Sequence, residues 1–274
     1  MAASLENPSL RGRVALVTGG SRGIGRMIAE GFVRAGARVY ISSRNEQACA
    51  ETVQELSPHG ECIALPADLS SVEGVIGLAG ALRDREGALH VLVNNAGRTW
   101  GATLEQYPPD AFDRVFAVNV RAVFHLTQQL LGELRAAASP DDPARVINIG
   151  SVNGTTVPTF GDLEAAERGE SPPMENYAYS ASKAAVHMLT RHLAQRLAGE
   201  HITVNAIAPG PFPSKMMDFA LNDEALRADV IGRVPLGRVG RAENVAGTAL
   251  HLASPGGAYT TGAILPVDGG LSTG

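Results

Sequence analysis

One stretch near the amino terminus constrains the fold more than any other part of the chain. An apolar run rich in valine covers residues 14–17, and a turn spaced Gly19-x3-Gly23-x-Gly25 follows it. Apolar residues then recur at helical spacing over 27–33. Glycines permit a sharp turn, let backbone N–H groups approach a phosphate and let a helix pack closely on a strand. The pattern predicts a strand, a turn and a helix whose positive N-terminal end faces an anion, although a purely structural turn is the alternative.

Strands and helices alternate along the rest of the chain. Apolar runs predict strands over 38–42, 61–65, 89–94, 145–149, 202–208 and 263–267, and helical spacing predicts helices over 45–56, 71–85, 110–135, 177–198 and 242–253. This alternation predicts parallel βαβ units with right-handed crossovers. The strands are apolar throughout, as expected where helices cover both faces of a sheet. We therefore expect one doubly wound α/β domain over 10–274 with a seven-stranded parallel sheet, after a flexible N-terminus over 1–9.

Two long segments interrupt this rhythm, at about 152–176 and 211–235, and each follows a predicted strand. Ligands of open α/β sheets bind beyond the carboxyl ends of the strands. Both segments are therefore candidate pocket walls, and a surface loop is the alternative for the first.

Composition excludes several classes of protein. The chain has 23 basic and 28 acidic residues and a formal net charge of −5, which argues against broad binding to nucleic acid or an anionic membrane. We find no signal-peptide pattern and no apolar run of membrane-spanning length. Cys49 and Cys62 lack a Cys-x-x-Cys spacing, so we expect free thiols and a cytoplasmic location. The seven histidines show no metal-ligand spacing, so no metal site is expected.

The end of the second predicted strand bears on the choice of cofactor. Dinucleotide-binding folds place an acidic residue there for the ribose 2′-hydroxyl of NAD, or an arginine for the 2′-phosphate of NADP. This strand ends at Ser43 and Arg44 without an acid, and Arg22 lies in the glycine turn. Because a guanidinium matches a phosphate in two-point geometry, the pair predicts NADP(H). Two solvated surface arginines are the alternative.

Four polar residues form a candidate catalytic set. Tyr179 and Lys183 lie one turn apart on the same face of a predicted helix, although such a pair is also common on protein surfaces. Ser151 follows a predicted strand, where its hydroxyl could face the same cleft. Asn119 lies inside a predicted helix, and because asparagine is a poor helix former its position suggests a role.

These motifs resemble those of the short-chain dehydrogenase/reductase family over about residues 10–270. The turn at 18–25 resembles the family's cofactor loop, and the stretches at 94–97 and 209–210 also match. Asn119, Ser151, Tyr179 and Lys183 match the family's Asn-Ser-Tyr-Lys tetrad in order. The resemblance implies a Rossmann-type fold and hydride transfer between nicotinamide and a carbonyl carbon.

The resemblance also implies a role for each site residue. Tyr179 would be the general acid or base, Ser151 would hold the substrate oxygen, Asn119 would hold a relay water, and Lys183 would lower the pKa of Tyr179 and bond the nicotinamide ribose. The implied cofactor contacts are Gly19, Ser21, Arg22, Gly23, Ile24, Gly25, Ser43, Arg44, Asp68, Leu69, Asn95, Ala96, Gly97, Tyr179, Lys183, Pro209, Gly210, Phe212 and Ser214. Ser214 stands where the family often has a threonine that bonds the nicotinamide carboxamide.

The segment at 211–215 is similar to the lid of bacterial 3-oxoacyl-[acyl-carrier-protein] reductase-like members. Apolar residues near the expected pocket suggest a substrate with an apolar part. They are Trp100, Phe212, Met216, Met217 and Phe219. We expect an NADPH-dependent reductase of a 3-oxoacyl thioester or similar β-keto compound. A polyol, sugar or steroid alcohol dehydrogenase remains an alternative.

An NADP-sensing regulatory protein on the same fold is a third interpretation, and the intact tetrad counts against it. Ser151 and Tyr179 lie 28 positions apart, which exceeds the usual family spacing and leaves the shape of the substrate entrance open. The chain end at 267–271 resembles that of members that pair into dimers or tetramers, and we expect a homotetramer.

Overall fold

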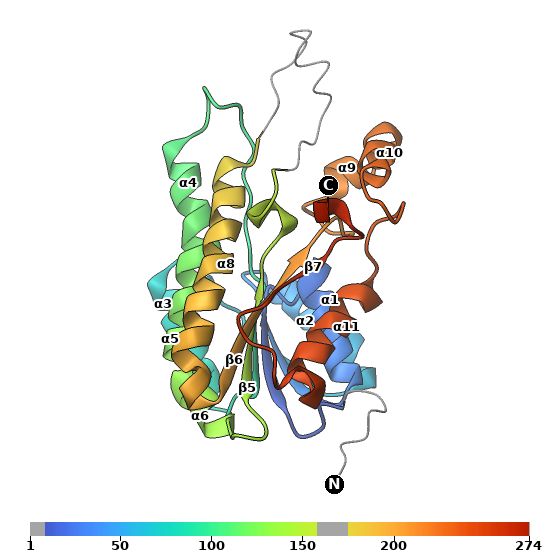
Figure 1. The fold of residues 1–274 in the computed structure, drawn as a ribbon. Helices are drawn as coiled ribbons and strands as arrows, with labels where there is room; N and C mark the ends of the chain where they lie inside the picture. Colours follow the sequence, from blue (N-terminus) through green and yellow to red (C-terminus); the bar gives the residue numbers. More distant parts are fainter. Residues whose placement is uncertain (1–8, 158–174, 274) are drawn as a thin grey trace.

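A computed structural model describes residues 9–157 and 175–273 (Figure 1). The expected N-terminal segment, except residue 9, and most of the 152–176 insertion lie outside the described residues. The strands are β1 (Val14–Thr18), β2 (Arg38–Ser42), β3 (Cys62–Ala64), β4 (Val91–Asn94), β5 (Ala144–Ile149), β6 (Ile202–Pro209) and β7 (Ile264–Val267). The helices are α1 (Gly23–Arg34), α2 (Glu46–Leu56), α3 (Val72–Arg83), α4 (Pro109–Phe116), α5 (Ala122–Gln129), α6 (Leu131–Ala137), α8 (Tyr177–Leu197), α9 (Asp218–Leu221), α10 (Glu224–Gly232) and α11 (Ala242–Ala253).

The seven strands form one sheet in the order β3-β2-β1-β4-β5-β6-β7, and every neighbouring pair is parallel. The expected doubly wound α/β fold is confirmed. The chain moves outward from β1 to β3 and then crosses back to β4 on the other side of β1. The ends of β1 and β4 therefore flank the topological switch point, where open α/β sheets bind their ligands.

Helices cover both faces of the sheet, with α1, α2 and α11 on one side and α3, α5, α6 and α8 on the other (Figure 1). Alternate residues of β1 pack into the two layers, with Ala15 and Val17 in one and Val14 and Leu16 in the other. Because both faces of the strand are buried, both need apolar side chains. This accounts for strands that are apolar throughout.

The prediction of one continuous helix over 110–135 was wrong. The segment divides into α4, a π-helical turn at Ala117–Arg121, α5 and α6. Asn119 lies at the centre of the π-helical turn and is 1% exposed. Such single π turns inside helices are frequent at functional sites. The side chain of Asn119 bonds to backbone outside the helix, as described below, and this explains the irregularity.

The sheet centre contains a short buried chain of polar side chains. The Asn94 amide donates to Asn148 Oδ1 at 2.9 Å, and the Asn148 amide donates to Thr190 Oγ1 at 2.9 Å. All three residues are buried. The chain joins β4 to β5 and β5 to α8, and it satisfies amides that would otherwise destabilise the apolar interior.

The predicted wall at 211–235 contains two helices that the sequence did not suggest, α9 and α10. Strand β2 and helix α11 have the predicted bounds, and the other predicted boundaries differ from those of the structure by at most two residues. No helix in the described ranges is long and apolar enough to cross a membrane.

Candidate active site

A cavity of about 1090 Å³ lies beyond the carboxyl ends of the strands. It is lined by all of the sequence-predicted site residues except Gly25 and Asn119. Those that line it are Gly19, Ser21, Arg22, Gly23, Ile24, Ser43, Arg44, Asp68, Leu69, Asn95, Ala96, Gly97, Ser151, Tyr179, Lys183, Pro209, Gly210, Phe212 and Ser214. Residues from both halves of the chain therefore converge on one cavity.

The glycine turn has the geometry of an anion site. Gly19 and Gly23 have φ of 65° and 53°, in the left-handed region that favours glycine. Arg22 precedes α1 and gives its first turn no side-chain cap, and that turn has no acidic residue. The N–H groups at the start of α1 therefore remain available to an anion in the cavity. These features fit the pyrophosphate of a dinucleotide.

Gly25 supports the turn from behind. A Cβ on Gly25 would overlap both the Asn95 side-chain nitrogen and the Gly19 carbonyl oxygen. The Asn95 amide donates to the carbonyl oxygens of Thr18 and Gly19 at 2.8 and 3.2 Å. The absence of a side chain at Gly25 thus lets α1, the turn and the end of β4 meet at the switch point.

The arginines expected to select the cofactor face the cavity. Arg22 and Arg44 are both exposed, and neither forms an ion pair with a described residue. Burial tends to raise the pKa of nearby Asp68, but hydrogen bonds from Ser70 and the charge of Arg44 lower it overall. Two guanidiniums that line this cavity, neither of them in an ion pair with a described residue, fit a 2′-phosphate.

Lys183 is anchored to the end of β5. Its ammonium donates a 2.7 Å hydrogen bond to the Ile149 carbonyl and lies 5.4 Å from the centroid of the Tyr179 ring. Lys183 is 4% exposed, and burial lowers its pKa to about 8. At pH 7 the group still carries its charge in most molecules.

The pKa of the Tyr179 phenol lies above its ordinary value. Burial raises the pKa of its phenol, and a hydrogen bond with Ser151 opposes the increase. Removal of the phenol from water is the largest contribution to this shift, and Lys183 is not among its resolved causes, so the expected lowering of the pKa by Lys183 stays a prediction. A phenol that keeps its proton at neutral pH is suited to donate it.

Ser151 and Asn119 are each fixed by hydrogen bonds to neighbouring backbone. Ser151 begins a 3₁₀ turn (Val152–Gly154), and its oxygen accepts a 3.2 Å bond from the Asn153 N–H. The Asn119 oxygen accepts from the Arg98 N–H at 2.8 Å, and its amide donates to the Arg98 carbonyl and to Ser182 Oγ, both at 2.9 Å. Asn119 thus joins the loop after β4 to α8 from outside the cavity.

Several residues that line the cavity were not predicted from the sequence. Arg98 and Thr99 come directly after the predicted 94–97 stretch, so their place beside that stretch was the available signal. Asn176 precedes α8, and its side-chain oxygen accepts a 3.2 Å bond from Thr99. Glu175 pairs with Ala102 in an antiparallel bridge. The described end of the 152–176 insertion is therefore fastened to the loop after β4.

The apolar residues expected near the substrate divide into three groups. Phe212, Met216 and Met217 line the cavity. Trp100 does not line it, and its ring lies 5.3 Å from the Arg114 guanidinium on α4. The side chain of Phe219 lies outside the described structure.

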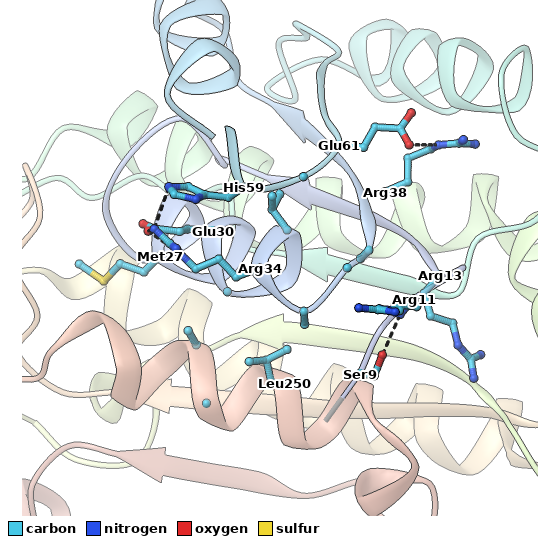
Figure 2. Close-up of a pocket in the computed structure, with 18 of the residues that line it drawn as sticks. Ser9, Arg11, Arg13, Met27, Glu30, Arg34, Arg38, His59, Glu61 and Leu250 are labelled. Carbon is cyan, nitrogen blue, oxygen red and sulfur yellow. Dashed lines mark hydrogen bonds and ion pairs between the residues drawn. The ribbon is translucent and has the colours of Figure 1, made fainter. Parts of the chain in front are cut away.

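A second hollow, of about 1160 Å³, lies near the amino ends of β1 and β2, against α1 and α11 (Figure 2). Its charges largely neutralise one another. Arg34 bonds Glu30 and the ring of His59, and Arg38 bonds Glu61. None of the sequence-predicted site residues lines it. The size of this hollow therefore does not identify a site, and the chemistry belongs to the other cavity.

Comparisons with known proteins agree with this geometry. Residues 19–272 match the family described as Enoyl-(Acyl carrier protein) reductase. The rhamnolipids biosynthesis 3-oxoacyl-[acyl-carrier-protein] reductase of Pseudomonas aeruginosa is 52% identical over 264 residues, covering 96% of this chain and 97% of that protein. A 3-oxoacyl-[acyl-carrier-protein] reductase of Vibrio harveyi is 36% identical, covering 96% and 98%.

A solved structure, the Pseudomonas aeruginosa RhlG/NADP active-site complex, has a TM-score of 0.89 to this chain at 50% identity, covering 97% of this chain and 99% of that one. The chain belongs to the short-chain dehydrogenase/reductase family. It is an NADP-dependent oxidoreductase. The turn at Gly19 and Gly23 and the cavity arginines Arg22 and Arg44 are the features of this structure that fit that cofactor.

Proposed function

We propose that the chain reduces a ketone, a 3-oxoacyl thioester or similar β-keto compound, to a secondary alcohol with NADPH. The observation that carries the proposal is the meeting of Tyr179, Ser151 and Lys183 in the cavity that also holds Arg22 and Arg44. The names of the two relatives support the substrate class.

NADPH supplies the hydride in this reaction. Tyr179 is the proton donor to the substrate oxygen, because burial keeps its phenol protonated at neutral pH. The hydroxyl of Ser151, which lines the same cavity as Tyr179, holds the same oxygen and stabilises the negative charge that develops on it.

Lys183 and Asn119 complete the proposed tetrad. Because its ammonium is held at Ile149, Lys183 is placed to bond the ribose hydroxyls of the cofactor. Both amide hydrogens of Asn119 are already used, by Arg98 and Ser182. One lone pair of its oxygen remains for the relay water that the family resemblance implies.

An assay of NADPH oxidation with a substrate panel tests the proposal. The panel contains 3-oxoacyl thioesters of several chain lengths, simple ketones and sugar ketones. We expect the highest kcat/KM with the thioesters, because Phe212, Met216 and Met217 offer apolar contacts. Activity confined to sugar ketones would reject the substrate class, and no activity with any ketone would reject the reductase.

We also propose a homotetramer located in the cytoplasm. Phe112 on α4, Phe124 on α5 and Met188 on α8 are 40%, 39% and 53% exposed, and their helices lie on the same side of the sheet (Figure 1). Such apolar side chains favour a twofold interface between copies. Both cysteines are free and buried, which suits a reducing compartment. Light scattering tests the assembly, and a monomer at every concentration would reject it.

A further inference from the structure

His187 is a buried side chain to which the proposed mechanism gives no role. It is 3% exposed and lies on α8, one turn beyond Lys183 and two turns beyond Tyr179. Neither nitrogen of its ring has a hydrogen-bond partner among the described residues. Because a buried polar group without a partner destabilises a fold, stability alone does not explain a histidine here.

The ring lies against the backbone on both sides of Ser151. A Cβ on Gly150 would overlap the ring nitrogen Nε2 and lie 2.7 Å from Cδ2. A Cβ on Gly154 would lie 2.6 Å from Cε1 and 2.8 Å from Nδ1. Neither glycine has a positive φ, so both are required for space and not for backbone conformation.

Two side chains that lie one turn apart on α8 thus contact the short segment at 149–154. Lys183 bonds the Ile149 carbonyl at its start, and the His187 ring supports Gly150 and Gly154. The only residues between the two glycines are Ser151, Val152 and Asn153. A shift of the ring would therefore move the Ser151 hydroxyl relative to Tyr179.

We infer that His187 is a positioning residue, whose ring sets where the Ser151 hydroxyl meets Tyr179 and the substrate oxygen. The inference rests on the proposed function, which gives Ser151 and Tyr179 their roles. The charge state of the ring agrees with it. Burial and the charges of Lys183 and Arg191 lower the pKa of His187 to about 4, against a weaker opposing effect of the Gly154 backbone, so the ring is neutral at pH 7.

A double-mutant cycle between positions 150 and 187 tests the inference. Gly150→Ala should remove nearly all turnover, because its Cβ overlaps the ring. His187→Ala should lower kcat about 10- to 100-fold, the loss that follows when a catalytic group moves by about an ångström. The double variant should turn over at least about tenfold faster than Gly150→Ala, because the nearest other atom to the new Cβ is the Ile207 oxygen at 3.3 Å.

Two readouts separate positioning from general damage. NADPH affinity, measured by fluorescence, should be nearly unchanged in His187→Ala, since the ring does not line the cavity. His192→Ala, at an exposed position five residues further along α8, should keep the original kcat. His187→Leu, which keeps most of the volume, replaces His187→Ala if that variant does not fold, and it should also lower kcat.

Original kcat in a folded His187 variant, or a double variant no faster than Gly150→Ala, would overturn the inference. Tyr179→Phe is measured in parallel. If Tyr179→Phe retains turnover, the proposed function fails. If Tyr179→Phe is inactive and the His187 variants are fully active, only the positioning role fails.

Discussion

The Lys183 ammonium and the Ile149 carbonyl are joined by a 2.7 Å hydrogen bond between helix α8 and the carboxyl end of strand β5. The bond draws one turn of α8 against the sheet and keeps the lysine away from solvent. Tyr179, one turn earlier, then lies beside Ser151 at the cavity. A tyrosine and a lysine at this spacing are often surface residues, and this bond is what makes them part of a site.

Tyr179→Phe removes the phenolic hydroxyl and keeps the ring. We expect turnover to fall about 10²- to 10⁴-fold, the usual contribution of a positioned proton donor. NADPH affinity should change little, because the ring still fills the same wall of the cavity. Steady-state kinetics and fluorescence titration check the two parts, and a variant with most of its turnover would show that another group donates the proton.

Arg44→Ala tests the reading of the 2′-phosphate. A charged hydrogen bond contributes about 1.5–3 kcal/mol, so NADPH affinity should fall roughly 10- to 150-fold. NADH lacks the phosphate, so its affinity should barely change. Arg227→Ala, at an exposed position on α10 away from the cavity, is the control. Equal loss of both cofactors, or an NADH preference in the original protein, would show that Arg44 does not contact the phosphate.

Gly25→Ala tests the junction at the switch point. The new Cβ would overlap Asn95 and the Gly19 carbonyl, so we expect a lower melting temperature and loss of NADPH binding. Gly77→Ala is the matched control, because a Cβ there meets nothing within 4 Å inside α3. It should stabilise the fold by about 0.5–1 kcal/mol. Equal melting temperatures for the two variants would refute the packing role of Gly25.

The buried ring of His187 predicts a pH dependence of stability. Its pKa is about 4 in the fold, against the ordinary histidine pKa of 6.5 that we take for the unfolded chain. Between these values the unfolded chain binds the extra proton, so the free energy of unfolding should decrease by up to about 3 kcal/mol as pH falls from 6.5 to 4. Urea titrations of His187→Leu should show a shallower decrease, whereas His192→Leu, exposed on the same helix, should match the original protein.

Much of this fold and site was predictable because the signals are local. Parallel strands need apolar residues on both faces, and the turn at Gly19 and Gly23 needs positive φ, so both leave a pattern in the sequence. Arg44 was predictable as a cavity residue because the end of β2 is fixed relative to the glycine turn. Residues that directly follow a strand, such as Ser43 and Arg44 after β2, were therefore expected at the cavity.

The rest depended on contacts between distant segments. The π-helical turn at Asn119 arises from hydrogen bonds to Arg98 and Ser182, which a local helical pattern does not contain. The upward shift of the Tyr179 pKa comes mainly from removal of the phenol from water, which the spacing of charges in the sequence does not contain. The support of Gly150 by His187 is visible only after α8 has packed on β5.

The polar chain from Asn94 through Asn148 to Thr190 also governs the rotation of α8 about its axis. Thr190 lies two helical turns beyond Lys183, so a change of one residue in the helix register would turn both Thr190 and Tyr179 by about 100°. Hydrogen bonds at the centre of the sheet thus fix the orientation of the helix that carries Tyr179 to the carboxyl ends of the strands. The catalytic geometry therefore depends partly on the side-chain amides of Asn94 and Asn148, which do not line the cavity.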